Sequence, residues 1–258
     1  MTDPVAVFRA LHVPGDPLVL FNIWDAGSAK AVAEAGAKAI ATGSYGVAEA
    51  QGFKDGEAFG LDVALVNLRR IIGVTDRSVT LDMESGYGAS ADDVGRSVAA
   101  ARAAGAAGIN LEDRMPGVAE LTSLAEQSAR IAAAAASGLF VNARCDAFRG
   151  QPADTHGPNL VAAVLERARA YADAGASGLF VPFTTNRACI AAICEGSPLP
   201  VNIIWTPASA GGFSGSAELA ELGVARISHG HRPWTAAMEW LADAARNVLA
   251  GAAPGYDG

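Results

Sequence analysis

The chain has 258 residues, of which 51% are hydrophobic and 18% charged, and its formal net charge is −8. This composition supplies ample material for a buried core and excludes an intrinsically disordered chain. An acidic chain also lacks the basic surface that nucleic acids and anionic membranes require, so we expect neither as a partner. A small anionic substrate is compatible with this charge, because one local arginine or a metal ion can outweigh it.

Cysteine usage and the N-terminus indicate a cytoplasmic protein. The three cysteines, Cys145, Cys189 and Cys194, are odd in number and show no metal-binding spacing, which fits a reducing compartment. The first residues, MTDPVAVFRALHVPG, lack the charged segment followed by an apolar core that defines a signal peptide. No apolar run is long enough to cross a bilayer, so we expect no membrane segment.

One local pattern recurs along the chain: an alanine-rich helical segment ends at a glycine, and a short apolar run follows. The glycines are Gly36, Gly105, Gly175 and Gly223. Glycine is favoured where a helix ends, because it adopts positive φ without strain. Continuous apolar runs are typical of strands that are buried on both faces. The pattern therefore predicts repeated βα units and a parallel sheet.

Eight such units account for the whole chain. The apolar runs predict strands over residues 18–24, 39–44, 79–84, 108–113, 139–146, 178–183, 200–205 and 225–229. The segments between them predict helices over residues 27–35, 57–72, 91–104, 121–137, 159–174, 186–195, 215–222 and 233–250. This count is typical of a (β/α)8 TIM barrel, which we predict as a single domain over residues 1–258. A doubly wound parallel sheet is the alternative.

Polar side chains interrupt several of these strands near their carboxyl ends, where barrel enzymes carry their chemistry. Residues two apart in a strand share a face, so the third, fourth and fifth strands each present polar groups to the barrel interior. These groups are Asp82 and Glu84, then Asn110 and Glu112, then Asn142, Arg144 and Asp146. Asn22, Trp24, Asp25 and Asn202 occupy similar positions on other strands.

The carboxylates of Asp82, Glu84 and Glu112 would be costly to bury without a partner. One explanation is a closed network of ion pairs, in which Arg144 neutralises part of the cluster. The other is a divalent cation held by the three carboxylates, with Arg144 binding an anionic substrate beside it. Three carboxylates against one arginine leave an excess of about two negative charges, which Mg²⁺ would balance. We therefore favour a magnesium site.

Other motifs are less specific. His229 and His231 lie two residues apart just after the last strand, where they could serve either the site or its rim. We expect Cys145 to face the helices as a packing residue. Tyr87 in SGYGAS could line the site or anchor its turn. The backbone N–H groups of TGSYG and the Ser44 hydroxyl could cradle an oxyanion.

Five segments, in order along the chain, resemble the isocitrate lyase/phosphoenolpyruvate mutase superfamily. They are NIWDAGSAKAVAEAG, ATGSYGVAEAQGFKDGE, LDMESGYG, INLEDR and VNARCDAF. The resemblance implies a barrel that binds Mg²⁺, or Mn²⁺, together with a 2-oxo acid or its enolate. It is strongest to small bacterial members of unassigned reaction.

The resemblance also implies roles for individual residues. Asp82, Glu84 and Glu112 would hold the metal ion, directly or through water, and Arg144 would lie against the substrate oxyanion. The other implied residues would contact the substrate: Ser44, Tyr45 and Gly46 would receive its carboxylate, and Trp24, Asp25, Asp55 and Asn202 would line the pocket. Tyr45, Asp55 and Arg144 are the expected catalytic residues.

The segment after the fourth strand departs from the superfamily pattern. The lyases that the chain resembles carry a Lys-Lys-Cys-Gly-His type of loop there, whose cysteine acts as acid and base, and the mutases carry a longer gating loop. This chain has EDRMPGVAELTSLAEQ, which is short and contains no cysteine, lysine or histidine. After the sixth strand it has FVPFTTN, where members often place Glu or His, and Glu84 replaces a commoner Asp.

We therefore expect a Mg²⁺-dependent lyase that cleaves or forms a C–C bond in a small 2-oxo or hydroxy dicarboxylate, through an enolpyruvate-like oxyanion. Two alternatives stay open: phosphoenolpyruvate or phosphonopyruvate chemistry at a P–C bond, by a mutase or a hydrolase, and non-catalytic binding of an oxo acid. The resemblance also implies a homo-oligomer, a dimer or tetramer, in which the last helix, TAAMEWLADAARNVLAG, contacts a second copy. The apolar face of that helix could equally serve ordinary barrel packing.

Overall fold

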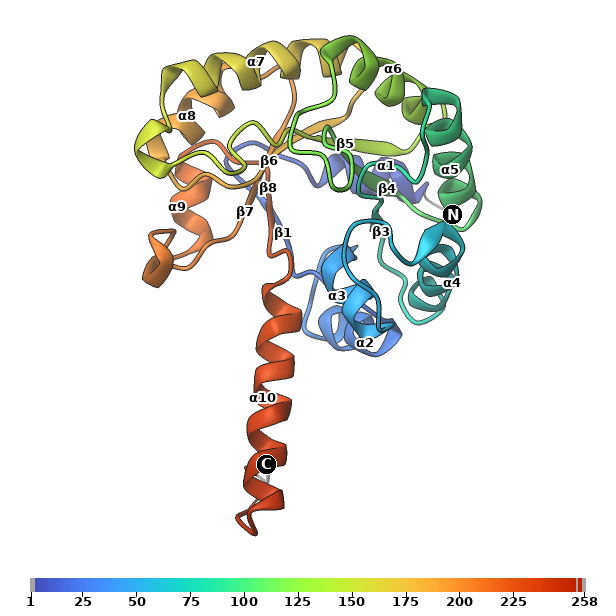
Figure 1. Ribbon diagram of the computed structural model, residues 1–258, viewed down its shortest axis with the longest axis vertical. Helices are drawn as coiled ribbons and strands as arrows, with labels where there is room; N and C mark the ends of the chain where they lie inside the picture. The colour runs from blue at the N-terminus through green and yellow to red at the C-terminus, as the bar shows by residue number, and fades with distance from the viewer. Residues whose placement is uncertain (1–2, 254, 257–258) are drawn as a thin grey trace.

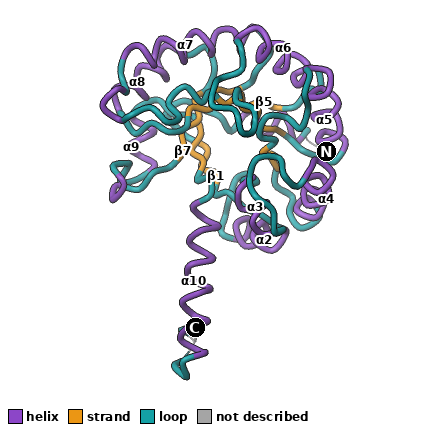
Figure 2. Tube along the Cα trace, in the orientation of Figure 1, coloured by secondary structure: helices purple, strands orange, loops and turns teal. Residues whose placement is uncertain are grey.

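The computed structural model describes residues 3–253 and 255–256. Within them, eight parallel strands form a nearly closed barrel (Figure 1), and the helices lie outside it (Figure 2). The strands follow one another around the barrel in chain order, without the reversal that a doubly wound sheet contains. This arrangement confirms the predicted (β/α)8 barrel.

The barrel closes between its first and second strands. From β2 to β8 each strand pairs in parallel with the next, and β8 pairs with β1. Beyond the ends of β1 and β2, the Ile23 N–H donates to the Ala41 carbonyl (2.8 Å), and the Gly43 N–H donates to the Ile23 carbonyl (3.1 Å). The strands are β1 (Leu18–Leu20), β2 (Ile40–Ala41), β3 (Val79–Asp82), β4 (Gly108–Glu112), β5 (Phe140–Arg144), β6 (Gly178–Val181), β7 (Val201–Ile204) and β8 (Arg226–Ser228).

The eight predicted helices are present, each within a few residues of its expected ends. They are α2 (Ala26–Glu34), α4 (Gly60–Ile72), α5 (Ala91–Ala103), α6 (Leu124–Ala135), α7 (Pro158–Asp173), α8 (Arg187–Gly196), α9 (Ser216–Glu221) and α10 (Arg232–Leu249). The four joint glycines end their helices at positive φ, as predicted: 97° at Gly36, 101° at Gly105, 93° at Gly175 and 84° at Gly223. Short 3₁₀ helices occur at Ala153–Thr155 and Ala208–Ala210.

Two further helices were not predicted, α1 (Pro4–Ala10) and α3 (Ser44–Ala50). Helix α1 begins with a proline at its first turn, and the Asp3 side chain accepts a hydrogen bond from the Val5 N–H. Helix α3 begins within the segment TGSYG, which lies outside the predicted helices. Gly46 lets this helix pack closely against the side chains of Trp24 and Trp234, because a Cβ at this position would be only 3.3 and 3.2 Å from them.

An apolar plug closes the amino ends of the strands. Phe8 of α1 is fully buried and packs in one cluster with Leu18, Leu20 and Phe140. Gly108 at the start of β4 leaves room for the Phe8 ring, because a Cβ at this position would lie 2.8 Å from it. The barrel therefore offers its carboxyl end to ligands, as in other barrels of this type.

Amide side chains from three strands form a polar layer within the barrel. Asn142 donates hydrogen bonds to Oδ1 of Asn110 (2.9 Å) and to Oδ1 of Asn202 (3.1 Å). Arg226, which is fully buried, also donates to Asn110 Oδ1 (3.1 Å). Burial lowers the pKa of Arg226 to about 9. The layer thus supports the residues that lie at the carboxyl ends of the same strands.

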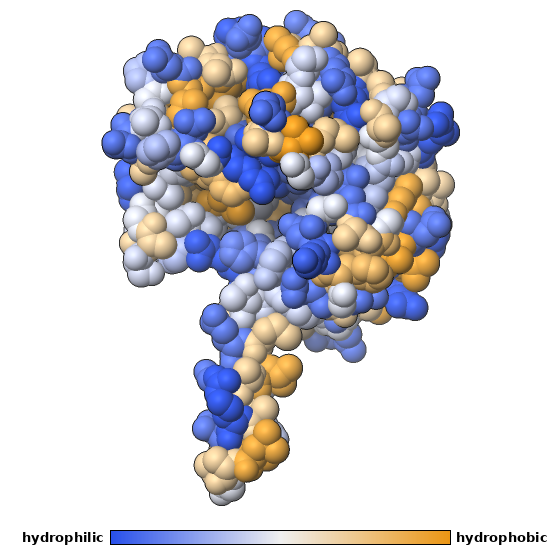
Figure 3. Space-filling model, viewed as in Figure 1, coloured by the Kyte–Doolittle hydropathy of each residue, from blue (hydrophilic) through white to orange (hydrophobic). Residues whose placement is uncertain are grey.

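The last helix, α10, leaves the barrel. It projects away from the strands in Figure 1, and hydrophobic side chains lie along one of its sides in Figure 3. Of its described residues only Pro233 is buried, and Trp240 is 58% exposed. Val19 of β1 is 43% exposed on the barrel. The start of α10 packs on the barrel through Trp234 and Trp24, but the rest of the helix does not provide the barrel packing that was one of its two predicted roles.

No helix in the described part of the chain is both long enough and apolar enough to span a membrane. The cytoplasmic location stays a prediction.

A buried arginine that the sequence did not single out shapes the turn after β3. Arg130 of α6 is fully buried and donates hydrogen bonds to the carbonyls of Ser85 (2.7 Å), Gly88 (2.9 Å) and Ala89 (3.2 Å). These carbonyls belong to the turn that directly follows Glu84. Arg130 therefore determines the path of the chain beside the predicted acidic site.

We expect Arg130→Met to lower the free energy of unfolding by about 3 kcal/mol, because three carbonyls would lose their donor. Chemical denaturation followed by circular dichroism would measure this change. Arg102→Met, on the exposed surface of α5, is the matched control and should change the free energy by less than about 0.5 kcal/mol. Equal, small effects of both substitutions would show that the turn does not depend on Arg130.

Candidate functional site

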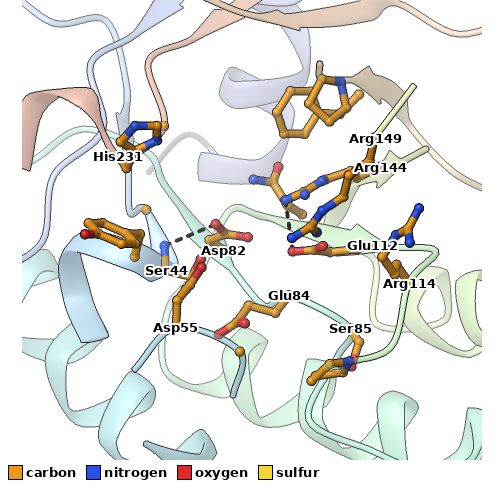
Figure 4. A pocket seen from close by; sticks show the side chains of 18 of the residues that line it. Ser44, Asp55, Asp82, Glu84, Ser85, Glu112, Arg114, Arg144, Arg149 and His231 are labelled. Atoms are coloured by element: carbon orange, nitrogen blue, oxygen red, sulfur yellow. Dashed lines mark hydrogen bonds and ion pairs between the residues drawn. The ribbon is translucent and has the colours of Figure 1, made fainter. Parts of the chain in front are cut away.

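A cavity of about 650 Å³ opens at the carboxyl ends of the strands, where the polar strand ends predicted it. Its volume lies in the range of small-molecule sites. Figure 4 shows acidic and basic side chains meeting around it. The predicted site residues that line this cavity are Ser44, Tyr45, Asp55, Asp82, Glu84, Glu112 and Arg144.

Four residues predicted to contact the substrate are not part of the cavity lining. Trp24 packs edge-on against Trp234, with 5.2 Å between the ring centroids, and Gly46 lies against both side chains. Asp25 caps the start of α2. Asn202 belongs to the buried amide layer. In this structure the four residues take part in packing, in helix capping and in the amide layer.

One wall of the cavity is acidic. Asp82, at the end of β3, accepts a hydrogen bond from the Ser44 N–H (3.2 Å) through Oδ2, whereas its buried Oδ1 has no hydrogen-bond partner. Asp55 lies close to Asp82 in Figure 4, and burial together with the charge of Asp82 raises the pKa of Asp55. Among the described residues, no salt bridge involves Asp55, Asp82 or Glu84. Within the part of the chain that the structure describes, no basic side chain therefore pairs with the carboxyl groups of this wall.

Glu84 is held by the segment that follows α3. Both of its carboxylate oxygens accept the Glu57 N–H, at 3.0 Å each. Glu57 in turn accepts the Ser85 hydroxyl (2.6 Å) and the Tyr87 N–H (3.1 Å). Glu84 and Tyr87 have positive φ values of 49° and 51°, which non-glycine residues adopt only where their surroundings hold them. Tyr87 is not part of the cavity lining and anchors this turn, one of its two predicted roles.

Arg144 forms the opposite wall, at the end of β5. It donates hydrogen bonds to both carboxylate oxygens of Asp146 (2.7 and 3.1 Å) and to Oε1 of Glu112 (2.9 Å). Burial alone would lower the pKa of Arg144, but the charges of Glu112 and Asp146 raise it. Of the ion-pair network that the sequence offered as one explanation, the pair between Arg144 and Glu112 is therefore present. Asp82 and Glu84 take no part in it.

The crowded carboxyl groups hold protons more tightly than usual. Burial and then the charge of Asp82 raise the pKa of Glu84 to about 8. Burial also raises the pKa of Glu112 to about 8, although Arg144 opposes this change. Oxygen-only ligands that repel one another, with one buried oxygen of Asp82 left without a partner, fit a hard divalent cation.

These carboxylates do not form a closed metal cage. Within the described part of the chain, no three Asp, Glu, His or Cys side chains come close enough to hold one ion together. Mg²⁺ commonly binds through one or two carboxylates and keeps several water molecules. Asp82 could therefore bind a cation directly through Oδ1, whereas Glu84 and Glu112 would contact its water molecules.

Comparisons with known proteins identify the family of this chain. The profile of the phosphoenolpyruvate phosphomutase family matches residues 8–249. The chain belongs to this family. It is 36% identical over 249 residues to the uncharacterised protein Rv1998c of Mycobacterium tuberculosis (strain ATCC 25618 / H37Rv). The matched region covers 95% of this chain and 89% of that protein.

A relative with a named reaction is 2-methylisocitrate lyase of Escherichia coli (strain K12), which is 31% identical over 212 residues, 77% of this chain and 69% of that enzyme. The chain is also 48% identical to a provisionally assigned phosphonomutase from Burkholderia cenocepacia J2315, whose crystal structure is known. The two structures superpose with a TM-score of 0.90, and the match covers 94% of this chain and 97% of that one. These findings confirm the resemblance to the isocitrate lyase/phosphoenolpyruvate mutase superfamily. Its enzymes are lyases, mutases and hydrolases.

In this family member the loop between β4 and α6 brings apolar groups to the mouth of the cavity. No side chain in residues 115–119 can act as an acid or a base at neutral pH. The loop residues that line the cavity in this range are Met115, Pro116, Gly117, Val118 and Ala119. Proton transfer would therefore fall to other residues of the cavity.

Several cavity residues escaped the sequence analysis. Arg149 and Phe183 lie in turns after β5 and β6, so the alternation along strands could not reveal them. Arg114, which directly follows β4 in the segment INLEDR, lines the cavity as well. His231 was considered a residue of the site or of its rim, and it lines the cavity with its ring 5.6 Å from the Tyr45 ring.

Because the pKa values of Glu84 and Glu112 are raised, we expect the stability of the folded protein to depend on pH and on Mg²⁺. Both folded-state pKa values, about 8, lie above the ordinary value of 4.5. The neutral carboxyls therefore stabilise the fold fully below pH 4.5, and this contribution is lost as the pH rises through 8. We expect the melting temperature of EDTA-treated protein to fall between about pH 6 and pH 9, and Mg²⁺ to raise it more at the higher pH.

Differential scanning calorimetry with EDTA and with Mg²⁺ would measure both effects. Glu84→Gln should reduce both the fall of the melting temperature with pH and the additional Mg²⁺ effect at high pH, because glutamine carries no titrating group. Glu239→Gln on the exposed side of α10 should change neither. An identical Mg²⁺ increment at both pH values would contradict a cation site made by these carboxylates.

Proposed function

We propose that this protein is a Mg²⁺-dependent lyase that breaks or forms a C–C bond in a small 2-oxo or hydroxy dicarboxylate. The observation that carries the proposal is the placement of Asp82 and Arg144 on opposite sides of one cavity, with Glu112 beside Arg144. An enolpyruvate-like oxyanion between them would meet positive charge on both sides. Stabilisation of this charge is the step that the arrangement favours.

Asp82 would hold the cation, either Mg²⁺ or Mn²⁺, and Glu84 and Glu112 would orient its water molecules. When bound, the cation would polarise the oxo group of the substrate as a Lewis acid. The free Oδ1 of Asp82 supports the direct role. The hydrogen bonds from Glu57 to Glu84 and from Arg144 to Glu112 would keep these carboxylates in place.

Arg144 would stabilise the oxyanion. Its guanidinium has five N–H donors, and three of them point to Asp146 and Glu112. The two others would be available to the substrate. Because the ion pairs already hold the guanidinium, it needs no reorganisation when negative charge develops.

Ser44 and Tyr45 would receive the substrate carboxylate at the start of α3. Both line the cavity, and the Ser44 N–H already contacts Asp82, so the Ser44 hydroxyl and the Tyr45 N–H are the donors we assign to the carboxylate. Gly46 contributes indirectly, because it lets α3 lie close to Trp24.

Asp55 and Tyr45 would move the protons. In the cleavage of a hydroxy acid, a base takes the hydroxyl proton and the C–C bond breaks. The hydroxyl carbon becomes the oxo group of one product, and the electron pair of the broken bond passes to the other fragment as an enolate. That fragment then takes up a proton at carbon. Asp55 has a raised pKa and lines the cavity, which suits it to be the base. Tyr45, with its ring beside His231, would return the proton.

Chemistry at a P–C bond is the second candidate. The 48% identity to a provisionally assigned phosphonomutase favours it. A P–C reaction also needs less proton transfer, in keeping with the apolar loop over residues 115–119. Its phosphoryl group would require positive charge in addition to that of Arg144.

A substrate panel would test the proposed function. We expect turnover of oxaloacetate, malate derivatives or citrate-like acids with Mg²⁺ and loss of turnover in EDTA. Asp82→Asn and Arg144→Lys should each lower kcat/KM by about 100-fold or more, since each removes charge or geometry from the oxyanion site. Asp92→Asn, on the exposed start of α5, is the control and should leave activity unchanged.

The other outcomes separate the candidates. Turnover of phosphonopyruvate alone would support the P–C reaction. Stabilisation by Mg²⁺ with oxalate, and no turnover of any panel member, would identify a non-catalytic binder of oxo acids. Activity that survives both EDTA and Asp82→Asn would sink the metal-dependent proposal.

We also propose that α10 contacts a second copy of the chain in a homo-oligomer. Its apolar residues are exposed, among them Leu241 at 52%, and so is Val19 on the barrel. Exposed apolar surface of this kind marks protein–protein contacts. The helix of one copy could cover the uncovered face of β1 in another.

Light scattering after size-exclusion chromatography would test the oligomer. Leu241→Glu combined with Val248→Glu should convert a dimer or tetramer to a smaller species, because both substitutions place charge in the apolar face of α10. Asn247→Glu adds one negative charge at a polar position of the helix and should leave the size of the oligomer unchanged. A monomeric wild-type protein would overturn the proposal.

A further inference from the structure

Two arginines at the cavity have no part in the proposed reaction. Arg114 and Arg149 lie with Arg144 around the fully buried Asp146, with N–O distances of 3.7 Å for Arg114 and 3.2 Å for Arg149. Arg144 alone already makes two hydrogen bonds to Asp146. Even with Glu112 counted, three guanidinium groups face two carboxylates, so this wall carries an excess of one positive charge.

Neutralisation of Asp146 does not account for the position of Arg149. The Arg149 side chain is 49% exposed and lines the cavity, whereas the Arg114 and Arg144 side chains are largely buried. Only one Arg149 nitrogen, an Nη, lies within hydrogen-bond distance of Asp146, at 3.2 Å. Most of its N–H donors are therefore not needed by Asp146.

Phe183 lies against the Arg149 guanidinium. The Cζ atoms of Arg144 and Arg149 each lie 5.5 Å from the centroid of the Phe183 ring. Such contacts with the face of a ring leave the N–H donors at the guanidinium edge free. Phe183 is itself held at a φ of 66°, a conformation that bulky residues rarely adopt, and it lines the cavity.

We propose that Arg149, held over Phe183 and tied to Asp146, binds the distal acidic group of a substrate whose oxo-acid end lies between Asp82 and Arg144. The inference rests on the proposed function, because that function places the oxo-acid end. A guanidinium edge binds a carboxylate or a phosphonate through paired N–H donors. The site thus selects acids with a charged group at both ends over acids that fill only the metal end.

Ligand affinities in the presence of Mg²⁺ would test this inference by isothermal titration calorimetry. Oxalate has no group beyond the metal end, whereas malate has a distal carboxylate and phosphonopyruvate a distal phosphonate. Arg149→Gln should weaken the binding of one or both longer acids by about 10- to 100-fold, the effect of losing charged hydrogen bonds. Oxalate binding should change by less than about threefold, which also reports that the variant is folded.

Two further variants make the test specific. Phe183→Leu removes the ring and should weaken the same longer acids in the same direction, by a smaller factor. Arg96→Gln on the exposed surface of α5 removes the same charge away from the cavity and should leave all three affinities unchanged. Arg149→Lys keeps the charge and should recover part of the lost affinity.

The outcomes distinguish this inference from the proposed function. If Arg149→Gln leaves the affinity ratio of the longer acids to oxalate unchanged, the inference is overturned and the proposed function stands. If the wild-type protein binds none of the three acids in a Mg²⁺-dependent way, both are overturned. A loss confined to phosphonopyruvate supports the inference and identifies the distal group as a phosphonate.

Discussion

The ion pairs of Arg144 with Glu112 and Asp146 determine how charge is divided at the mouth of the barrel. They bind one guanidinium to two carboxylates, and they hold it with donors left over for a ligand. Because Arg144 is used in this way, it does not reach Asp82 or Glu84. The cavity consequently has an acidic wall and a basic wall, which suits a cation and an anion bound side by side.

The barrel brings these walls together through the order of its strands. Asp82, Glu112 and Arg144 end the neighbouring strands β3, β4 and β5, so their side chains meet at one end. Beneath them lies the amide layer, and beneath that the plug around Phe8 closes the other end. A cavity that opens at one end limits the access of water to a charged intermediate, which strengthens the electrostatic interactions within it.

Strand alternation was a reliable guide for some residues and no guide for others. It placed Asp82, Glu112 and Arg144 at the cavity because side chains two apart share a face and parallel strands stay in register. It had no means of finding Arg130, which reaches the turn after β3 from a helix, or Arg149, which follows β5 in a turn. Strand position and the family resemblance both predicted Trp24 at the cavity, whereas its packing with Trp234 puts it behind the wall.

The sequence by itself determined the βα repeat, the helix ends, the acidic strand ends and the family. Each depends on local periodicity, on glycine conformation or on motifs in order, and all of these can be read along the chain. Only the tertiary structure decided that Arg144 pairs with Glu112, that Arg149 lies over Phe183 and that α10 leaves the barrel. Such outcomes depend on distances between residues far apart in sequence, and packing of the whole barrel determines those distances.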